Sequence, residues 1–348
     1  MKEKWDVVIV GAGPAGTIAA HNLSKAGKSV LLIDQKILPR HKMCGGIVTN
    51  LASKLIEKEM GKIPDIVLSR PRNVKGVQLY YPDGKRLFFK EKGLNVWRKD
   101  FDFWMAIKAA EASAVVEDAT VLINFKDKGK EGVEIQLKTP DGNKIINADY
   151  LLGCDGARST VRKILYPELL KKEQVKHTYV YQEFIKGDVD LGREFLNTFI
   201  DPNFSDSYAY VNFKDDLLFI GLGSDLGRNV RRYLATFQEF LEEAFKLKIE
   251  KVVNKEGCYI PLFVEKFNFV FGRGRTILVG ESAGFLSIFA EGISSAVRSG
   301  IAAADSVLAA EENEPDLLKL YAPRLDKLIK SLKEVWKMSS QVFPGILV

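Results

Sequence analysis

Short apolar runs separated by polar turns are the main pattern along this chain, and such runs are typical of strands buried in a sheet. Residues 7–10 form one run and residues 29–33 form a second, and between them residues 18–23 show the apolar spacing of a helix. Two later runs, at 148–153 and 276–279, each lead into a glycine-containing turn. This order of strands and helices predicts an α/β fold.

Two further segments alternate around a Pro-Asp-Gly tripeptide, which favours a turn. Residues 77–89 surround the turn at 82–84, and residues 133–150 surround the turn at 140–142. Both segments are expected to fold as antiparallel hairpins. The sequence therefore predicts antiparallel as well as parallel strands.

The turn after the first run reads Gly-x-Gly-x-x-Gly at residues 11–16. Gly11 permits the tight turn, Gly13 lets the backbone approach a pyrophosphate, and Gly16 lets the helix pack closely on the strand. Asp34 ends the second run, 18 residues beyond Gly16, where an acid can accept hydrogen bonds from a ribose. This arrangement predicts a dinucleotide site and disfavours NADP, but it does not choose between FAD and NAD.

Two later motifs decide the cofactor. Residues 151–158 read Leu-Leu-Gly-Cys-Asp-Gly-Ala-Arg, and residues 277–284 read Ile-Leu-Val-Gly-Glu-Ser-Ala-Gly. Together with the glycine loop, they resemble the three FAD-contact segments of the p-hydroxybenzoate hydroxylase superfamily of flavoproteins. The resemblance implies that the dinucleotide is FAD.

The resemblance also implies where each motif meets the cofactor. The Asp-Gly pair that matches Asp155 and Gly156 lies near the ribityl and pyrophosphate groups in that superfamily. Glu281, where most members carry Asp, is implied to contact the ribityl chain, although it is one methylene longer. Gly292 and Ile293 begin a helix whose backbone N–H groups suit the pyrimidine oxygens of the flavin.

Two more segments resemble cofactor contacts of the superfamily. Arg98 opens a segment similar to its Arg-x-x-Phe-Asp, whose Arg approaches the phosphates of the flavin. Val121 lies in a segment that resembles the strand whose backbone holds adenine.

Residues 44–46, Cys-Gly-Gly, resemble the geranylgeranyl reductase family, in which this tripeptide passes close to the isoalloxazine ring. Glu-Gly-Ile at 291–293 fits the same branch, and Gly284 stands where the hydroxylases usually carry His. Residues 208–214 resemble the Tyr-x-Trp-x-Phe-Pro-Lys of the reductases, although Tyr210 replaces Trp and the proline is missing. The chain therefore resembles the reductase branch, while its departures leave the substrate open.

The resemblance implies a Rossmann-type FAD-binding domain interleaved with a mixed β-sheet substrate domain. The FAD-binding domain would comprise residues 1–70, 96–170 and 272–348, and the substrate-binding domain residues 71–95 and 171–271. The implied reaction is reduction of carbon–carbon double bonds in a prenyl lipid chain by hydride transfer from N5 of reduced flavin. Ferredoxin or NAD(P)H would serve as the external electron donor.

The expected site follows from the same matches. Tyr208, Tyr210 and Phe213 are expected to bind the substrate, and Cys44 and Tyr208 are the candidates for supplying a proton. The residues expected to contact the cofactor are Gly11, Gly13, Pro14, Ala15, Gly16, Asp34, Gln35, Arg40, Cys44, Gly45, Gly46, Arg98, Val121, Asp155, Gly156, Gly280, Glu281, Gly292 and Ile293.

Two other functions fit the flavin motifs. One is a flavin-dependent monooxygenase of an aromatic or quinone substrate, against which Gly284 weighs. The other is a non-catalytic flavoprotein that carries electrons or holds a lipid. Residues 178–271 hold 19 of the 32 Phe and Tyr residues, and these side chains suit either a long apolar pocket or the core of a sheet. Cys44 fits either a chemical role or that of a small residue in a tight loop.

Composition and charge narrow the other possibilities. The net charge of +6 on 348 residues is mild, and no basic-aromatic cluster indicates nucleic-acid binding. No run of 18 apolar residues predicts a transmembrane helix. Three cysteines, far apart and odd in number, fit a cytoplasmic protein, and no Cys/His spacing predicts a metal site.

Residues 314–338 form an amphipathic, basic stretch interrupted by Pro323. Such a stretch fits two interpretations: packing on its own domain or resting on a membrane surface. The expected location is therefore cytoplasmic, with peripheral contact to a membrane surface left open.

Overall fold

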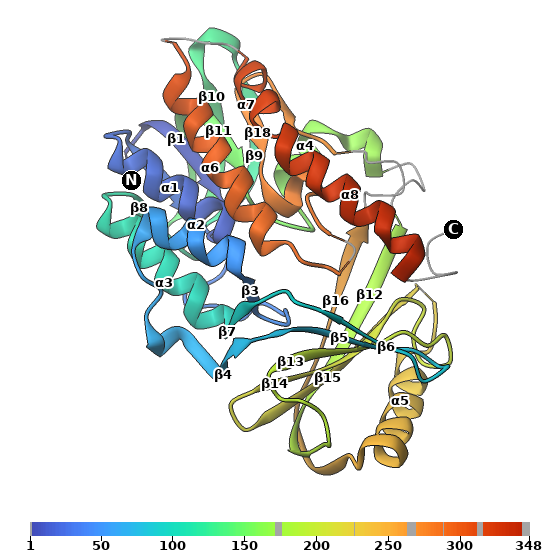
Figure 1. Cartoon of the computed structure of the whole chain (residues 1–348). Coiled ribbons are helices and arrows are strands. Elements are labelled where there is room, and N and C mark those ends of the chain that lie inside the picture. Colours follow the sequence, from blue (N-terminus) through green and yellow to red (C-terminus); the bar gives the residue numbers. More distant parts are fainter. Residues whose placement is uncertain are drawn as a thin grey trace.

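The computed structural model describes residues 2–170, 176–225, 227–262, 269–287, 289–311 and 316–342. Figure 1 shows a sheet covered by helices in its upper half and a second sheet with helix α5 in its lower half. A small sheet of three strands, in the order β3-β7-β4, lies where the two halves meet (Figure 1).

The first sheet has eight strands in the order β17-β18-β11-β1-β2-β8, and the hairpin partners β10 and β9 continue from β11. Five of its strands, β8, β2, β1, β11 and β18, pair with one another in parallel. Because the carboxyl ends of parallel strands lie at one edge of a sheet, the turns after β1, β2, β11 and β18 come together there. The strands are β1 (Lys4–Val10), β2 (Val30–Ile33), β8 (Val115–Glu117), β9 (Val121–Asp127), β10 (Val133–Thr139), β11 (Gly142–Gly153), β17 (Gly272–Arg273) and β18 (Thr276–Leu278).

Helices pack on this sheet, and α1 and α6 approach each other closely. A Cβ at Gly300 of α6 would lie 2.5 Å from the carbonyl oxygen of Ala15 in α1, so only glycine fits there. Helix α8 packs on the same core through Leu328 and Leu332, and its lysines lie exposed on the other side. Within the described residues, no helix is both long and apolar enough to cross a bilayer. These helices are α1 (Pro14–Lys25), α2 (Asn50–Met60), α3 (Arg98–Glu111), α4 (Thr160–Leu165), α6 (Ile293–Ala309), α7 (Leu318–Arg324) and α8 (Asp326–Val342).

The second sheet has seven strands in the order β16-β12-β15-β14-β13-β5-β6. Helix α5 (Val230–Phe245) covers one of its faces, and Phe199, Phe204 and Phe237 are buried between the helix and the sheet. Many aromatic residues of the segment 178–271 therefore pack a core. The strands of this sheet and of the small sheet are β3 (Ile47–Thr49), β4 (Leu68–Val74), β5 (Gly76–Tyr80), β6 (Arg86–Phe89), β7 (Gly93–Val96), β12 (Lys176–Asp188), β13 (Phe195–Phe199), β14 (Ala209–Lys214), β15 (Leu217–Asp225) and β16 (Lys248–Leu262).

The predicted fold class is confirmed, because a largely parallel sheet with helices stands beside a second, mixed sheet. Both predicted hairpins are also confirmed: β5 pairs with β6, and β10 pairs with β11, each antiparallel. The division into two domains stays a prediction. Of the segment 71–95, β5 and β6 join the strands of 171–271, whereas β7 pairs with β3 and β4 instead.

Candidate functional site

The glycine loop joins β1 to α1 at the carboxyl edge of the first sheet. The N–H of Gly11 donates to the carbonyl oxygen of Ile33 at 2.7 Å, which ties the loop to the end of β2. A Cβ at Gly11 would lie 2.4 Å from the carbonyl oxygen of Cys154, and one at Gly16 would lie 2.1 Å from that of Gly11. At Gly13, in contrast, a Cβ would meet only Nη2 of Arg40, at 3.7 Å. The loop is thus packed against protein at its first and third glycines and has room at its second.

Carboxylates and guanidinium groups alternate beside this loop. Oδ2 of Asp34 accepts the N–H of Ala12 at 3.1 Å and Nε of Arg40 at 2.9 Å. Nη1 of Arg40 donates in turn to Asp102 at 3.1 Å, and Arg98 donates to both oxygens of Asp102 at 2.7 and 2.8 Å. Although burial opposes the charge of Arg98, Asp102 and Cys44 outweigh burial and raise the pKa of Arg98. The network holds two guanidinium groups near the N-terminal end of α1.

The turns after β11 and β18 face each other. Gly156 has a φ of +71°, and a Cβ there would lie 3.4 Å from Oε2 of Glu281. Glu281 is the second residue of a short 3-10 helix, Gly280–Ala283. Its carboxylate accepts a hydrogen bond from Nζ of Lys42 at 3.1 Å. Burial works against the charge of Glu281, but Lys42 outweighs it and lowers the pKa of this carboxyl. The two motifs that the sequence places 125 residues apart are therefore neighbours.

Asp155 carries an oxygen that lacks a partner. Its Oδ2 accepts the N–H groups of Thr160 and Val161 at 2.6 and 3.2 Å. Its Oδ1 is buried and has no hydrogen-bond partner within the described parts of the chain. Burial raises the pKa of this carboxyl. A ligand hydroxyl at this turn would satisfy Oδ1.

Helix α6 begins at Ile293, with Gly292 as its N-cap. The neighbouring Glu291 accepts the N–H of Ser294 at 2.7 Å, so one donor of the first turn is already used. Burial raises the pKa of Glu291. The contact of Gly292 and Ile293 with the flavin stays a prediction.

The loop of residues 44–46 is held against the second sheet and against β7. The N–H of Gly46 donates to Sγ of Cys44 at 3.3 Å, and its carbonyl oxygen accepts the N–H of Val96 at 2.8 Å. Nδ2 of Asn212 in β14 donates to the carbonyl oxygen of Gly45 at 3.0 Å. The Cys-Gly-Gly tripeptide therefore bridges the two halves of the molecule.

Strand β14 presents Tyr210, Asn212 and Lys214 toward this loop. The hydroxyl of Tyr210 donates to Gln182 in β12, and its ring lies against Gly221, where any Cβ would collide with it. Tyr208, just before the strand, donates its hydroxyl to the carbonyl oxygen of Phe289 at 2.9 Å. Burial raises the pKa of both phenols, and Cys44 lies near enough to contribute to each shift.

Phe213 does not join these side chains. Successive residues of a strand point to opposite faces, and Phe213 lies fully buried in the core on the α5 face with Val211. The rings of Tyr208 and Tyr210, in contrast, are neighbours, with their centres 6.2 Å apart. We therefore do not include Phe213 among the substrate-binding residues proposed below.

The remaining predicted cofactor residues lie near the end of β2. Asp34 is buried and Gln35 is exposed, and the N–H of Thr120 donates to the carbonyl oxygen of Asp34 at 2.9 Å. This contact places the start of β9, and with it Val121, beside Asp34. The adenine contact of Val121 stays a prediction.

Residues 6–157 match the family model described as FAD dependent oxidoreductase. The matched segment contains the glycine loop, Asp34 and the turn at Asp155, so the similarity to FAD-dependent oxidoreductases covers the first two cofactor motifs. The cofactor of the chain is FAD. This flavoprotein is 29% identical to Protein CbrA of Escherichia coli over 309 residues, which is 85% of this chain and 82% of that protein.

Solved structures show the same fold. The flavoprotein is similar to a geranylgeranyl bacteriochlorophyll reductase-like protein from Thermoplasma acidophilum, with a TM-score of 0.77, 19% identity and coverage of 99% and 98% of the two chains. It is also similar to the myxobacterial chondrochloren halogenase CndH, with a TM-score of 0.76, 15% identity and coverage of 98% and 82%. At these identities the likeness shows the fold alone.

The residues present fit FAD at three points. The backbone at Gly13 is open to a phosphate, because a Cβ there would meet only Arg40. Asp155 holds a buried oxygen that a ribityl hydroxyl would satisfy. At Gly45 a Cβ would meet nothing within 4 Å, which leaves room for a ring beside the backbone. The flavoprotein therefore offers contacts for the pyrophosphate, the ribityl chain and the ring.

Several residues of this region were missed by the sequence reasoning. Lys214 and Asp102 were seen only as the ends of matched motifs, and Asn95 and Asn212 carried no signal of their own. Their contacts join segments more than 100 residues apart or depend on burial, which no local pattern reveals.

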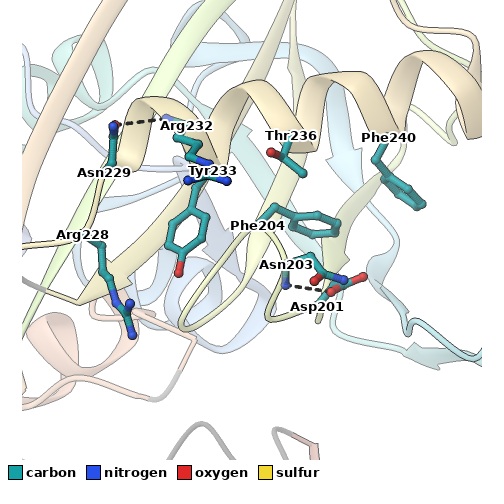
Figure 2. A pocket seen from close by; sticks show the side chains of 9 residues that line it. All are labelled: Asp201, Asn203, Phe204, Arg228, Asn229, Arg232, Tyr233, Thr236 and Phe240. Atoms are coloured by element: carbon teal, nitrogen blue, oxygen red, sulfur yellow. Dashed lines mark hydrogen bonds between the residues drawn. The ribbon is translucent and has the colours of Figure 1, made fainter.

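A separate cavity of about 550 Å³ lies beside helix α5. Figure 2 shows Arg232, Tyr233 and Thr236 on the helix facing a loop that carries Asn203 and Phe204. None of the predicted site residues lines it. Its lining residues are Asp201, Asn203, Phe204, Arg228, Asn229, Arg232, Tyr233, Thr236 and Phe240.

Lys214 is a buried lysine whose protonation should be visible in stability. Burial lowers its pKa from 10.5 to about 7. The unfolded chain then binds more protons than the folded protein between these two values, so the contribution of Lys214 to stability is least favourable at pH 7 and below and improves as the pH rises. In Lys214→Met this dependence is absent. We expect the free energy of unfolding of the wild type, relative to that of the variant, to rise by about 2 kcal/mol between pH 7 and pH 9.

Urea unfolding of both proteins in matched buffers measures this difference. Lys54→Met, at an exposed position on α2, is the control and should show no such slope against the wild type. A constant difference between the wild type and Lys214→Met across this range would contradict the lowered pKa.

Proposed function

We propose that this flavoprotein reduces carbon–carbon double bonds in the chain of a prenyl lipid. The observation that carries the proposal is the Cys-Gly-Gly loop, which resembles that of the geranylgeranyl reductases and lies against β14 beside Tyr208 and Tyr210. Within this proposal, residues 71–95 and 171–271 form the substrate-binding domain. The similarity in fold to the geranylgeranyl bacteriochlorophyll reductase-like protein of Thermoplasma acidophilum supports the same proposal.

FAD, when bound in its reduced form, supplies a hydride from N5. Residues 11–16, Asp34 and Arg40 bind the dinucleotide end, and Asp155 and Glu281 bind the ribityl chain. At Gly45 a Cβ would meet nothing within 4 Å, so the backbone there can lie beside the ring without a side chain between them. The protein's part is to orient the double bond and to exclude water from it.

The proton has to come from a side chain of the site or from water. Tyr208 and Tyr210 already donate their hydroxyl protons to Phe289 and Gln182. The sulfur of Cys44 accepts the N–H of Gly46, so its own S–H is left to donate toward a substrate. We therefore assign the proton donor to Cys44 and the alignment of the substrate to the two tyrosines.

The remaining partners follow from the reaction. Ferredoxin or NAD(P)H is proposed as the electron donor that reduces the flavin. We also propose that the exposed lysines of α8 rest on the lipid surface that holds the substrate.

An anaerobic experiment tests the function. The purified flavoprotein is reduced with dithionite, and geranylgeranyl lipids are added without oxygen. We expect the oxidised flavin bands to return while a saturated lipid appears in the mass spectrum. In Cys44→Ala, which keeps its FAD, lipid-dependent reoxidation should slow by about 100-fold, the usual size of a general-acid contribution. Flavin that stays reduced until oxygen enters would contradict prenyl reduction and favour a monooxygenase or an electron carrier.

A further inference from the structure

Lys214 is a buried lysine whose ammonium is held by uncharged acceptors. Its ammonium donates to Oδ1 of Asn95 at 2.5 Å and to the carbonyl oxygen of Val96 at 2.8 Å, and both acceptors are uncharged. In the described part of the chain, no ion pair within 4 Å includes Lys214. Only 1% of the residue is exposed. Burying an ammonium without an ion pair costs stability, because its two hydrogen bonds replace only part of its hydration.

Lys214 and Cys44 meet at the same glycine. A Cβ at Gly46 would lie 2.7 Å from Nζ of Lys214, and the N–H of Gly46 donates to Sγ of Cys44. Gly46 has a φ of +67°, so its backbone and its missing side chain both make this approach possible. The cysteine and the lysine lie 170 residues apart in the sequence. They come together because Asn212 of β14 holds the loop through its hydrogen bond to Gly45.

The charged and titratable groups around the pair are few. Lys214 faces Cys44 from the loop and Asp215 from the end of its own strand, and the carboxylate of Asp215 is occupied by Trp97 and by the backbone of Arg70. Its other neighbours, the rings of Trp97 and Phe219, lie 5.8 Å from Nζ and carry no charge. Cys44 faces Arg98 from α3, Tyr208 and Tyr210 from the β14 side, and Cys258 from β16.

We propose that Lys214 is the proton partner of Cys44: its ammonium favours the thiolate that remains after Cys44 donates and then returns a proton to that sulfur. This inference rests on the proposed function for its place in the reaction. Reduced FAD would supply the hydride for one carbon of the double bond, and the S–H proton of Cys44 would go to the other carbon. An N–H bond of Lys214 then breaks as the S–H bond forms, and the resulting amine takes a proton from water.

The chemistry of Lys214 suits this exchange. Burial lowers its pKa to about 7, so its ammonium can give up a proton near neutral pH, which an exposed lysine cannot. Arg98 also touches Cys44, but a guanidinium stays charged at these pH values and cannot take part in proton transfer. Lys214 therefore acts through Cys44 without touching the substrate.

The reactivity of Cys44 tests the pairing without any substrate. Flavin-loaded protein is treated with iodoacetamide at pH 6, where Lys214 is protonated, and modification of the Cys44 peptide is followed by mass spectrometry. A neighbouring ammonium favours the reactive thiolate, so Lys214→Met should lower the alkylation rate of Cys44 about tenfold, and we call this fall in rate the alkylation shift. Lys214→Arg, which keeps the charge, should retain the wild-type rate at this pH. Equal rates for the wild type and Lys214→Met would overturn the proposal.

Two controls make the result specific. Cys258, whose thiol has its pKa raised to about 11 by burial, reports any general opening of the structure and should stay slow in all three proteins. The visible spectrum of the bound flavin and the melting temperature establish that each variant is folded and loaded. An alkylation shift accompanied by rapid modification of Cys258 would be a structural effect and would overturn the assignment.

The turnover readout separates this inference from the proposed function. In the wild type, kcat for lipid reduction should fall as the pH rises through about 7, because Lys214 loses its proton, and in Lys214→Arg this fall should be absent. Lipid reduction with no alkylation shift would overturn the pairing and leave the reductase function intact. An alkylation shift without reduction of any prenyl lipid would support the pairing and reject the reductase function.

Discussion

Replacing Gly13 by valine should abolish FAD binding while leaving the protein folded. Gly13 is the N-cap of α1 with a φ of −89°, a conformation that valine adopts without strain. A Cβ there would meet only the end of the flexible Arg40 side chain, at 3.7 Å. The introduced valine side chain, however, would occupy the space in which the backbone has to approach the pyrophosphate. We expect the affinity for FAD to fall by at least about 100-fold, which is about 2.7 kcal/mol.

Flavin absorbance per mole of purified protein and titration of the FAD-free protein measure this loss, and the far-ultraviolet circular dichroism reports the fold. Asn229→Val is the matched control, because Asn229 caps α5 and accepts the N–H of Arg232 at 3.2 Å. Loss of this helix cap should lower the free energy of unfolding by about 1 kcal/mol without changing the affinity for FAD. A Gly13→Val protein that retains FAD with wild-type affinity would mean that the pyrophosphate does not lie over this loop.

The strands, turns and helix that carry the cofactor motifs could be predicted because each depends on a few consecutive residues. Gly11, Gly13 and Gly16 follow a buried strand and precede a helix, and Asp34 ends the next strand. The strand order then brings these turns together with Asp155 at the carboxyl edge of one sheet. Local sequence signals and the geometry of parallel strands are sufficient for this half of the site.

The part of the site built by the second sheet could not be predicted in the same way. Asn95 and Lys214 form a hydrogen bond across 119 residues, and Asn212 reaches Gly45 across 167 residues. Pairing over such distances depends on how β14 is placed against the loop, which no local pattern encodes. Alternation along a strand predicts that Phe213 and Tyr210 point to opposite faces of β14, yet the motif match grouped these two residues together.

Another network of the second sheet also lacked a sequence signal. Tyr210 donates to Gln182, Gln182 donates to Glu256, and Glu256 pairs with His41 at 2.5 Å. The chain of contacts runs from the buried phenol to a half-exposed imidazole. Since Tyr210 takes the place of the usual Trp, this orientation of its hydroxyl is a property of this chain rather than of the resembled motif.

Removal of the carboxylate of Asp102 is the second change with a large expected effect. Asp102 is 1% exposed and pairs with the two guanidinium groups of Arg98 and Arg40. Asp102→Ala leaves the buried charge of Arg98 without compensation, and breaking a buried pair in this way costs about 3–5 kcal/mol. Urea unfolding at equal FAD concentration should show this loss. Adding Arg98→Met to Asp102→Ala should recover part of it, because the uncompensated charge is then gone.

Asp65→Ala provides a control of the same chemistry at a different depth. Asp65 pairs with Arg72 at 2.6 Å, which is as short as the pairs of Asp102, but the two side chains are 61% and 50% exposed. Water already solvates that pair, so its loss should cost less than about 1 kcal/mol. If Asp102→Ala cost no more than Asp65→Ala, the alternating carboxylates and guanidinium groups beside the glycine loop would not be a buried electrostatic network. Because Asp102 also holds Arg40 next to Gly13, Asp102→Ala should weaken FAD binding in addition to stability, and Asp65→Ala should not.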